Sequence, residues 1–158
     1  MGPWNRSRSS LLVGSAMLIL AACDGSSPTQ PEGPLAFATI HTGTSLGFPP
    51  IGEDVGTVIG DGDRWQARWQ ELGRTGPAPA VDFSREMVLL ATGPGCCGET
   101  AIRSVGQNRG RVLVDVLSQA SNNTICIAAD YSVHAVKVQR VSGPVDFLVT
   151  KATKSCGG

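Results

Sequence analysis

Short apolar segments separated by glycine- and proline-rich turns dominate the chain after about residue 35. Met87–Thr92 is almost entirely apolar, and Arg111–Leu117 alternates between apolar and polar positions. Short β-branched runs and a period of two are typical of strands. The segments predicted to be strands are Leu35–Thr42, Val55–Ile59, Met87–Thr92, Thr100–Gly106, Arg111–Leu117, Tyr131–Arg140 and Val145–Thr150.

One segment has the pattern of a helix. Trp65, Trp69 and Leu72 are spaced i, i+4 and i+7, which places them on one helix face. Asp61 or Asp63 can accept hydrogen bonds from the first turn, and the glycine after Leu72 ends the helix. The spacing of the tryptophans favours a stripe that faces the core over a surface on which a ligand stacks.

The predicted strands are joined by short turns, and short turns favour antiparallel pairing. We therefore expect a mainly β domain of the α+β class. It would have an antiparallel sheet, curled or forming a sandwich, with one short amphipathic helix packed on it. The chain has 158 residues, which suits one domain, and residues 35–158 are predicted to form it.

The N-terminus has the features of a bacterial lipoprotein signal. Two arginines and no acidic residue precede the apolar run Leu11–Ala22, which is too short to span a bilayer as a lasting helix. The run ends in Leu-Ala-Ala-Cys, which resembles a lipobox. Residues 1–22 are therefore predicted to be removed and Cys23 to carry lipid. A plain signal peptide and a transmembrane anchor are the alternatives.

Residues 23–34 have no large apolar side chain and contain three prolines, so we expect a flexible tether. The protein would then lie in the bacterial cell envelope, attached to a membrane by its lipid on the extracytoplasmic side. The whole chain has 13 basic and 13 acidic residues. This balance disfavours a nucleic-acid partner, which requires a basic face.

The residues able to perform acid–base chemistry are few. The two histidines are His41 and His134, and Asp115 or Asp130 could orient His134 in a hydrolase. No nucleophile motif such as G-x-S-x-G accompanies them. We expect His134 to be packed or hydrogen-bonded on a sheet, and we predict no catalytic residue, no metal site and no cofactor.

Four cysteines lie in the part predicted to fold. In an exported domain, Cys96, Cys97, Cys126 and Cys156 suggest two disulfides. Of the three possible pairings, one joins the neighbours Cys96 and Cys97. The other two link one neighbour to Cys126 and the other to Cys156, and we favour these because adjacent residues of an extended chain point to opposite faces. The alternatives are a four-thiolate zinc site and a vicinal redox disulfide.

Several landmarks between residues 65 and 147 occur in a characteristic order. They are the tryptophan pair Trp65 and Trp69, the element Val81-Asp82-Phe83-Ser84, the turn Cys97-Gly98-Glu99-Thr100, the strand His134-Ala135-Val136-Lys137-Val138 and the closing Pro144-Val145-Asp146-Phe147. This order resembles the PrcB C-terminal domain family, which includes a lipoprotein subunit of a bacterial surface protease complex. The chain departs from that family at Cys96-Cys97-Gly98, where a Gly-Tyr pair is usual, and at Asp130-Tyr131, where a proline is usual.

The resemblance implies a role in binding or assembling a partner, with no chemistry of its own. We therefore expect a lipid-anchored binding or assembly module for an exported partner protein, for example a secreted protease. The loop Gly93–Gly98 and an exposed edge of the strand containing His134 are the expected docking surface. The alternative function is a thiol-based metal-binding or redox protein that uses Cys96, Cys97, Cys126 and Cys156.

Overall fold

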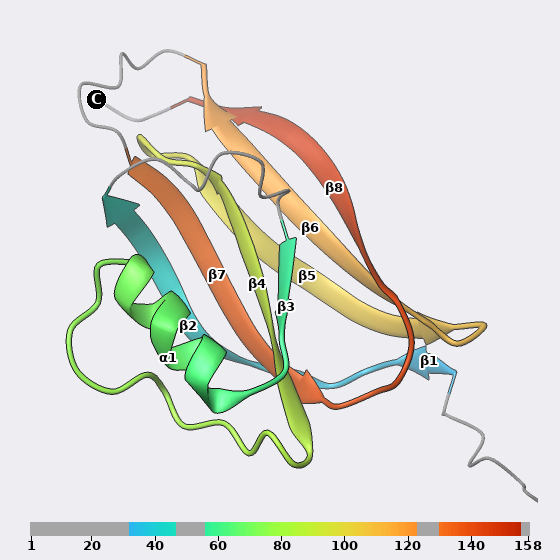
Figure 1. The fold of residues 1–158 in the computed structure, drawn as a ribbon. Helices are drawn as coiled ribbons and strands as arrows, with labels where there is room; N and C mark the ends of the chain where they lie inside the picture. The colour runs from blue at the N-terminus through green and yellow to red at the C-terminus, as the bar shows by residue number, and fades with distance from the viewer. Residues whose placement is uncertain (1–31, 47–55, 123–129, 156–158) are drawn as a thin grey trace, which may run out of the picture.

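The computed structural model describes residues 32–46, 56–122 and 130–155. The predicted signal peptide, Cys23, Cys126 and Cys156 lie outside these ranges. In the described residues, eight strands and one helix follow one another along the chain (Figure 1). They are β1 (Gly33–Pro34), β2 (Phe37–Leu46), β3 (Gly56–Ile59), α1 (Gly62–Glu71), β4 (Glu86–Pro94), β5 (Glu99–Asn108), β6 (Arg111–Ser121), β7 (Asp130–Gln139) and β8 (Val145–Lys154).

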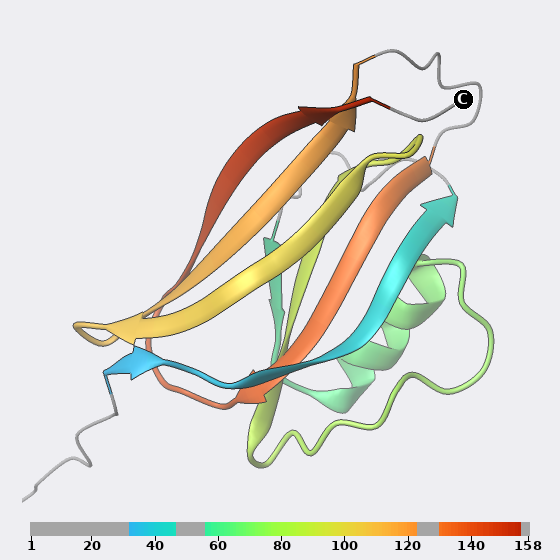
Figure 2. The same cartoon turned by 180° about the vertical axis from the view of Figure 1, so that it is seen from behind.

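The strands form two sheets that pack face to face. One sheet has the order β1-β5-β6-β8 and the other the order β2-β7-β4-β3. The helix α1 covers the outer face of the second sheet, and the outer face of the first sheet carries no helix among the described residues (Figures 1 and 2). The expectation of a mainly β sandwich with one short helix is confirmed.

Two apolar clusters hold the three layers together. The cluster between the two sheets is built from buried residues of β4, β5, β6 and β7, and the second cluster lies between the helix and the β2-β7-β4-β3 sheet. The inter-sheet cluster contains Met87, Leu89, Ala91, Ile102, Val105, Val112, Val114, Val116, Val136 and Val138. The helix-side cluster contains Ile59, Trp65, Leu72, Val88, Leu90, Tyr131, Val133 and Ala135.

The position of β4 explains its continuous apolar sequence. Six consecutive residues from Met87 to Thr92 are buried, because odd positions face the inter-sheet cluster and even positions face the helix. Alternation disappears from a strand that is covered on both faces. By contrast, β6 buries only every second residue along most of its length, as expected for a strand with one solvent-exposed face.

The helix begins where the sequence predicts. Of the two candidate caps, Asp61 is the N-cap: its carboxylate accepts a hydrogen bond from the backbone N–H of Arg64 at 2.8 Å. Asp63 lies in the first turn, where its charge favours the positive end of the helix dipole. Gly73, with φ of 71°, follows the last turn, since glycine takes a left-handed conformation without steric cost.

The pairing of β8 differs from the expected all-antiparallel arrangement. Although Ser142-Gly143-Pro144 connects β7 to β8 closely, the two strands lie in different sheets, and β8 pairs with β6 in parallel. Gly143 allows this crossing: its φ is 118°, and an added Cβ would lie 2.1 Å from the carbonyl oxygen of Gly110. The crossing places the apolar side chains of Val145, Phe147 and Val149 against the inter-sheet cluster.

One boundary also differs from the prediction. The folded part begins before Leu35, because Gly33 and Pro34 of the expected tether form β1 and pair with β5. In the turn between β5 and β6, Arg109 and Gly110 take positive φ values of 50° and 72°.

Candidate functional site

Five of the landmark residues form the core signature expected from the sequence: Trp65, Trp69, Val81, Asp82 and Phe83. Four of them pack between the helix and the sheet. Trp65 is 2% exposed, and its indole N–H donates to the carbonyl of Pro79 at 2.9 Å. Trp69 is half-buried and lies beside Trp65, with ring centroids 5.6 Å apart. Val81 and Phe83 pack against the same cluster from the connection between α1 and β4. These residues serve the fold, so they do not mark a binding site.

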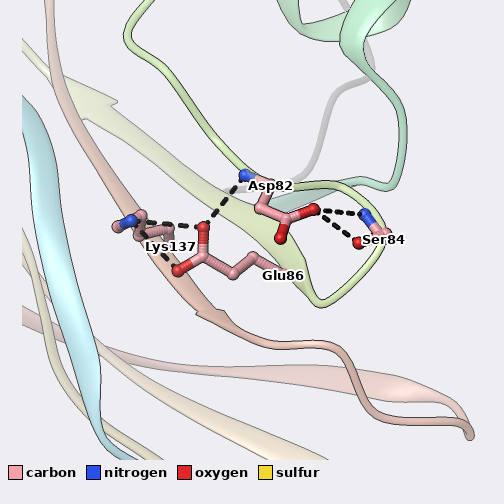
Figure 3. Close-up of polar contacts among 4 residues, drawn as sticks. All are labelled: Asp82, Ser84, Glu86 and Lys137. Carbon is pink, nitrogen blue, oxygen red and sulfur yellow. Dashed lines mark hydrogen bonds and ion pairs between the residues drawn. The ribbon is translucent and has the colours of Figure 1, made fainter.

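The fifth signature residue, Asp82, closes the same connection through an exposed polar cluster (Figure 3). Its carboxylate accepts from the Ser84 hydroxyl at 2.6 Å and from the Ser84 backbone N–H at 3.1 Å, which lowers the pKa of Asp82. The carboxylate of Glu86 accepts from the backbone N–H of Asp82 and from Lys137, and the Lys137 contact is the main cause of the lowered pKa of Glu86. The cluster ties the connection to β4 and β7.

His134 is hydrogen-bonded at both ring nitrogens inside the sandwich. Its Nδ1 accepts from the backbone N–H of Ile102 at 2.8 Å. The proton of the neutral ring is therefore on Nε2, which lies 3.0 Å from the Thr39 hydroxyl oxygen and donates to it. Burial lowers the pKa of His134, consistent with a ring held neutral. The imidazole therefore joins β7 to β5 of the opposite sheet and to β2.

The other residues considered for hydrolase chemistry are engaged elsewhere. Asp115 pairs with Arg103 at 2.9 Å, and Asp130 accepts from the backbone N–H of Cys96 at 2.8 Å. His41 packs edge-on against Trp69 with a centroid distance of 5.0 Å. Burial and the nearby Arg74 lower the pKa of His41. The structure therefore does not bring together a nucleophile, a base and an orienting acid from these candidates.

A cavity of about 640 Å³ opens beside His134, between β2 and β5. Residues 42–44, 98–101 and 132–134 line it. In its lining, the hydroxyl of Ser132 donates to the carbonyl of Pro94 at 2.9 Å and lies 2.6 Å from the Thr100 hydroxyl. Because these groups are hydrogen-bonded to one another, they join β4, β5 and β7 by polar contacts beside the cavity.

The cysteine loop is a tight turn in an uncommon conformation. Cys96 and Cys97 have φ values of 52° and 59°, and the N–H of Gly98 donates to the carbonyl of Gly95 at 2.9 Å. Two consecutive positive φ values are typical of a type I′ turn, which favours asparagine and glycine. The sulfurs of Cys96 and Cys97 are both disulfide-bonded. Their predicted partners, Cys126 and Cys156, lie outside the described residues, so the pairing stays a prediction.

Within the described ranges, no group of three or more histidine, cysteine, aspartate or glutamate residues is arranged to hold a metal ion. The same residues contain no helix long and apolar enough to cross a membrane. The alternative zinc site would require Cys126 and Cys156, so it falls partly outside the described chain.

The expectation that the strand containing His134 has an exposed edge is wrong. β7 lies between β2 and β4 and is paired along both sides. In this central position both of its faces are covered: six consecutive residues from Tyr131 to Val136 are buried. Among the described strands, the edges of the two sheets are β2 and β3 in one, and β1 and β8 in the other.

One of these edges, β8, faces β3 across an open side of the sandwich (Figure 1). A groove of about 680 Å³ runs between Gly56 and Val58 of β3 and residues 145–149 of β8. The ring of Phe147 fills its base, since an added Cβ on Gly56 would lie 2.1 Å from that ring. Val58 is 37% exposed and Leu148 is 52% exposed, and they are the exposed large hydrophobic residues of the described chain.

Charged residues divide β8 into two halves. Near its start, Asp146 forms a two-point ion pair with Arg111 of β6, with N–O distances of 2.6 and 2.7 Å. Near its end, Lys154 lies 3.3 Å from Glu99, and Lys151 forms no ion pair within the described residues. The first half of the edge is therefore apolar with its charge compensated, and the second half is basic.

This edge could not be identified from the sequence, because local patterns do not indicate which strand pairs with β8. A signal was present in Val145–Thr150, where Leu148 is a large apolar residue at a position that should face solvent. Alternation predicts that Val145, Phe147 and Val149 face the core, which leaves Leu148 on the outer face.

Comparisons of the chain with protein-family models, with curated proteins and with solved structures found no match. The resemblance to the PrcB C-terminal domain family therefore stays a prediction from the landmark residues.

Proposed function

We propose that this protein is a lipid-anchored binding module of the bacterial cell envelope that takes up an extended segment of an exported partner protein at the free edge of β8. The observation that carries the proposal is the position of Val58 and Leu148. Both flank the same groove beside β8, whose edge opposite β6 has no neighbour among the described strands. Single exposed apolar residues are ordinary, but two at one open edge favour an interaction site.

Strand addition suits this edge physically. A free edge strand presents backbone N–H and C=O groups that an added strand can pair, and side-chain pockets beside it provide specificity. β8 is ten residues long, so it offers room for a full-length added strand. The groove between β3 and β8 would receive alternate side chains of that strand, while Leu148 would contact side chains on the outer face.

The N-terminal features support the location of this activity. A lipid on Cys23 and the proline-containing segment 23–31 would hold the folded domain near a membrane while leaving it free to reach a partner. Because His134 is fixed as a neutral hydrogen-bonded ring and Asp115 and Asp130 are engaged elsewhere, we propose binding without catalysis.

The test is affinity capture of the full-length protein from detergent-solubilised membranes, followed by mass spectrometry. The wild type and a control variant, Gln70→Ala on the exposed side of α1, should recover the same exported protein in comparable amounts. Leu148→Asn, which changes only an exposed side chain of β8, should recover much less. Equal recovery by Leu148→Asn, or no exported protein with the wild type, would contradict the proposal.

A further inference from the structure

The hydrogen bonds between β6 and β8 determine which residues of β8 face the free edge. The carbonyl of Pro144 accepts from Val112, and the carbonyl of Lys154 accepts from Asn122, so both point toward β6. Main-chain groups of a strand alternate in direction from one residue to the next. The N–H and C=O groups of residues 145, 147, 149, 151 and 153 therefore point away from β6, toward the open side.

The side chains beside these main-chain groups change character along the strand. Over residues 145–149 the edge is bordered by Phe147, Leu148 and, across the groove, Val58. Over residues 151–154 it is bordered by Lys151 and Lys154. The ion pair of Lys154 with Glu99 joins two exposed side chains, and such pairs contribute little and exchange readily.

We propose that the segment bound at β8 has acidic residues at one end and apolar or β-branched residues at the other. This inference rests on the proposed function. Antiparallel pairing is the more stable arrangement for an added strand. The acidic residues then lie in the N-terminal part of the partner segment, opposite Lys154 and Lys151, and the apolar residues lie in its C-terminal part, opposite residues 145–149.

The same lysines disfavour a second copy of this chain as the occupant. Lysine on a free edge is a common protection against pairing between identical sheets, because it adds positive charge to both partners. The same lysines would attract an added strand that carries acidic side chains. Opposite charges placed directly across an antiparallel pair stabilise it, whereas like charges destabilise it.

The experiment uses the full-length protein in detergent and two labelled ten-residue peptides, with fluorescence anisotropy as the readout. The acidic peptide, ETTETVVATV, places its glutamates opposite Lys154 and Lys151 in the antiparallel arrangement. In the control peptide, KTTKTVVATV, lysines replace the glutamates. We expect the acidic peptide to bind about tenfold more tightly, and its advantage to shrink at high salt.

A matched pair of variants assigns the effect to β8. Lys151→Glu combined with Lys154→Glu should reverse the preference between the two peptides. Arg64→Glu combined with Arg85→Glu makes the same change of net charge at exposed positions away from β8 and should leave the preference unchanged. These residues are exposed, so the variants test recognition rather than folding.

The outcomes separate the two proposals. Equal binding of both peptides, with loss of both in Leu148→Asn, would overturn the charge inference and leave the proposed function standing. Concentration-dependent self-association that Leu148→Asn abolishes would overturn the inference in favour of a second copy. Failure of both peptides to bind the wild type would contradict the inference and the proposed function together.

Discussion

Replacing Trp65 by alanine should remove much of the stability of the helix-side cluster. Trp65 is 2% exposed, and a buried tryptophan covers roughly 150–250 Å². At about 25 cal/mol per Å² this burial corresponds to about 4–6 kcal/mol, which is an upper bound because the unfolded chain is partly compact. Truncations of this kind cost about 3–5 kcal/mol, and we expect a value near 4 kcal/mol here.

Two further variants divide this loss into its parts. Trp65→Phe keeps most of the apolar volume but leaves the carbonyl of Pro79 without the indole donor, and should cost about 1–2 kcal/mol. Trp69→Ala removes a ring that is less completely buried than that of Trp65, so it should cost less than Trp65→Ala, roughly 3 kcal/mol.

The assay is urea unfolding of each purified variant, followed by far-ultraviolet circular dichroism and analysed for both midpoint and slope. We expect the loss of unfolding free energy to be largest for Trp65→Ala, smaller for Trp69→Ala, and smallest for Trp65→Phe. A cost for Trp65→Ala below about 1 kcal/mol would refute the assignment of Trp65 to the core. A cost for Trp69→Ala equal to that of Trp65→Ala would refute the difference in burial.

Three other predictions concern pH, backbone conformation and location. Because folding lowers the pKa of His134, the unfolded chain binds more protons than the folded chain below about pH 6.5. The contribution of His134 to stability should therefore fall with decreasing pH there by at most about 1.4 kcal/mol per unit, and His41, whose pKa is also lowered, adds to the same trend. Urea unfolding at several pH values between 5 and 8 should show that the unfolding free energy of His134→Asn changes less with pH than that of the wild type. Gly143→Ala should lower the melting temperature, since its Cβ would approach the Gly110 carbonyl. Gly62→Ala should not, because its Cβ would meet the Phe83 ring only at an ordinary van der Waals distance of 3.8 Å. Cys23→Ser should move the protein from the membrane to the soluble fraction, and retention in the membrane would contradict lipid anchoring.

Much of the fold follows from local patterns in the sequence. The cap at Asp61, the i, i+4, i+7 apolar spacing and the glycine after the helix act over a few residues, so they could be recognised directly. The apolar run in β4 could likewise be recognised as a strand covered on both faces. In each case the residues that determine the conformation lie within the segment itself.

The pairing of strands depends on distant residues and was harder to predict. Nothing near Val145 indicates that β8 crosses to the other sheet and runs parallel to β6. That arrangement depends on the close approach of Gly143 to Gly110, more than thirty positions away in the chain. For the same reason, the exposed edge predicted for the strand containing His134 lies instead on β8, which carries Leu148.

The polar residues that stand out in the sequence as candidates for a functional site support the fold instead. His134 attracts attention as a base, but its two nitrogens are used by Ile102 and Thr39. Asp82 attracts attention as part of a motif, but it closes a turn with Ser84. The candidate surface instead consists of apolar and lysine side chains whose importance depends on their position at an unpaired edge.

If an exported partner lies along β8, site-specific photo-crosslinking in cells should trap it there. A photoreactive amino acid replaces Leu148 in one variant and Gln70, on the exposed side of α1, in the other. We expect a discrete crosslink to one exported protein from position 148 and none from position 70. Identical crosslinking patterns from the two positions, or no crosslink from position 148, would show that the partner does not lie along β8.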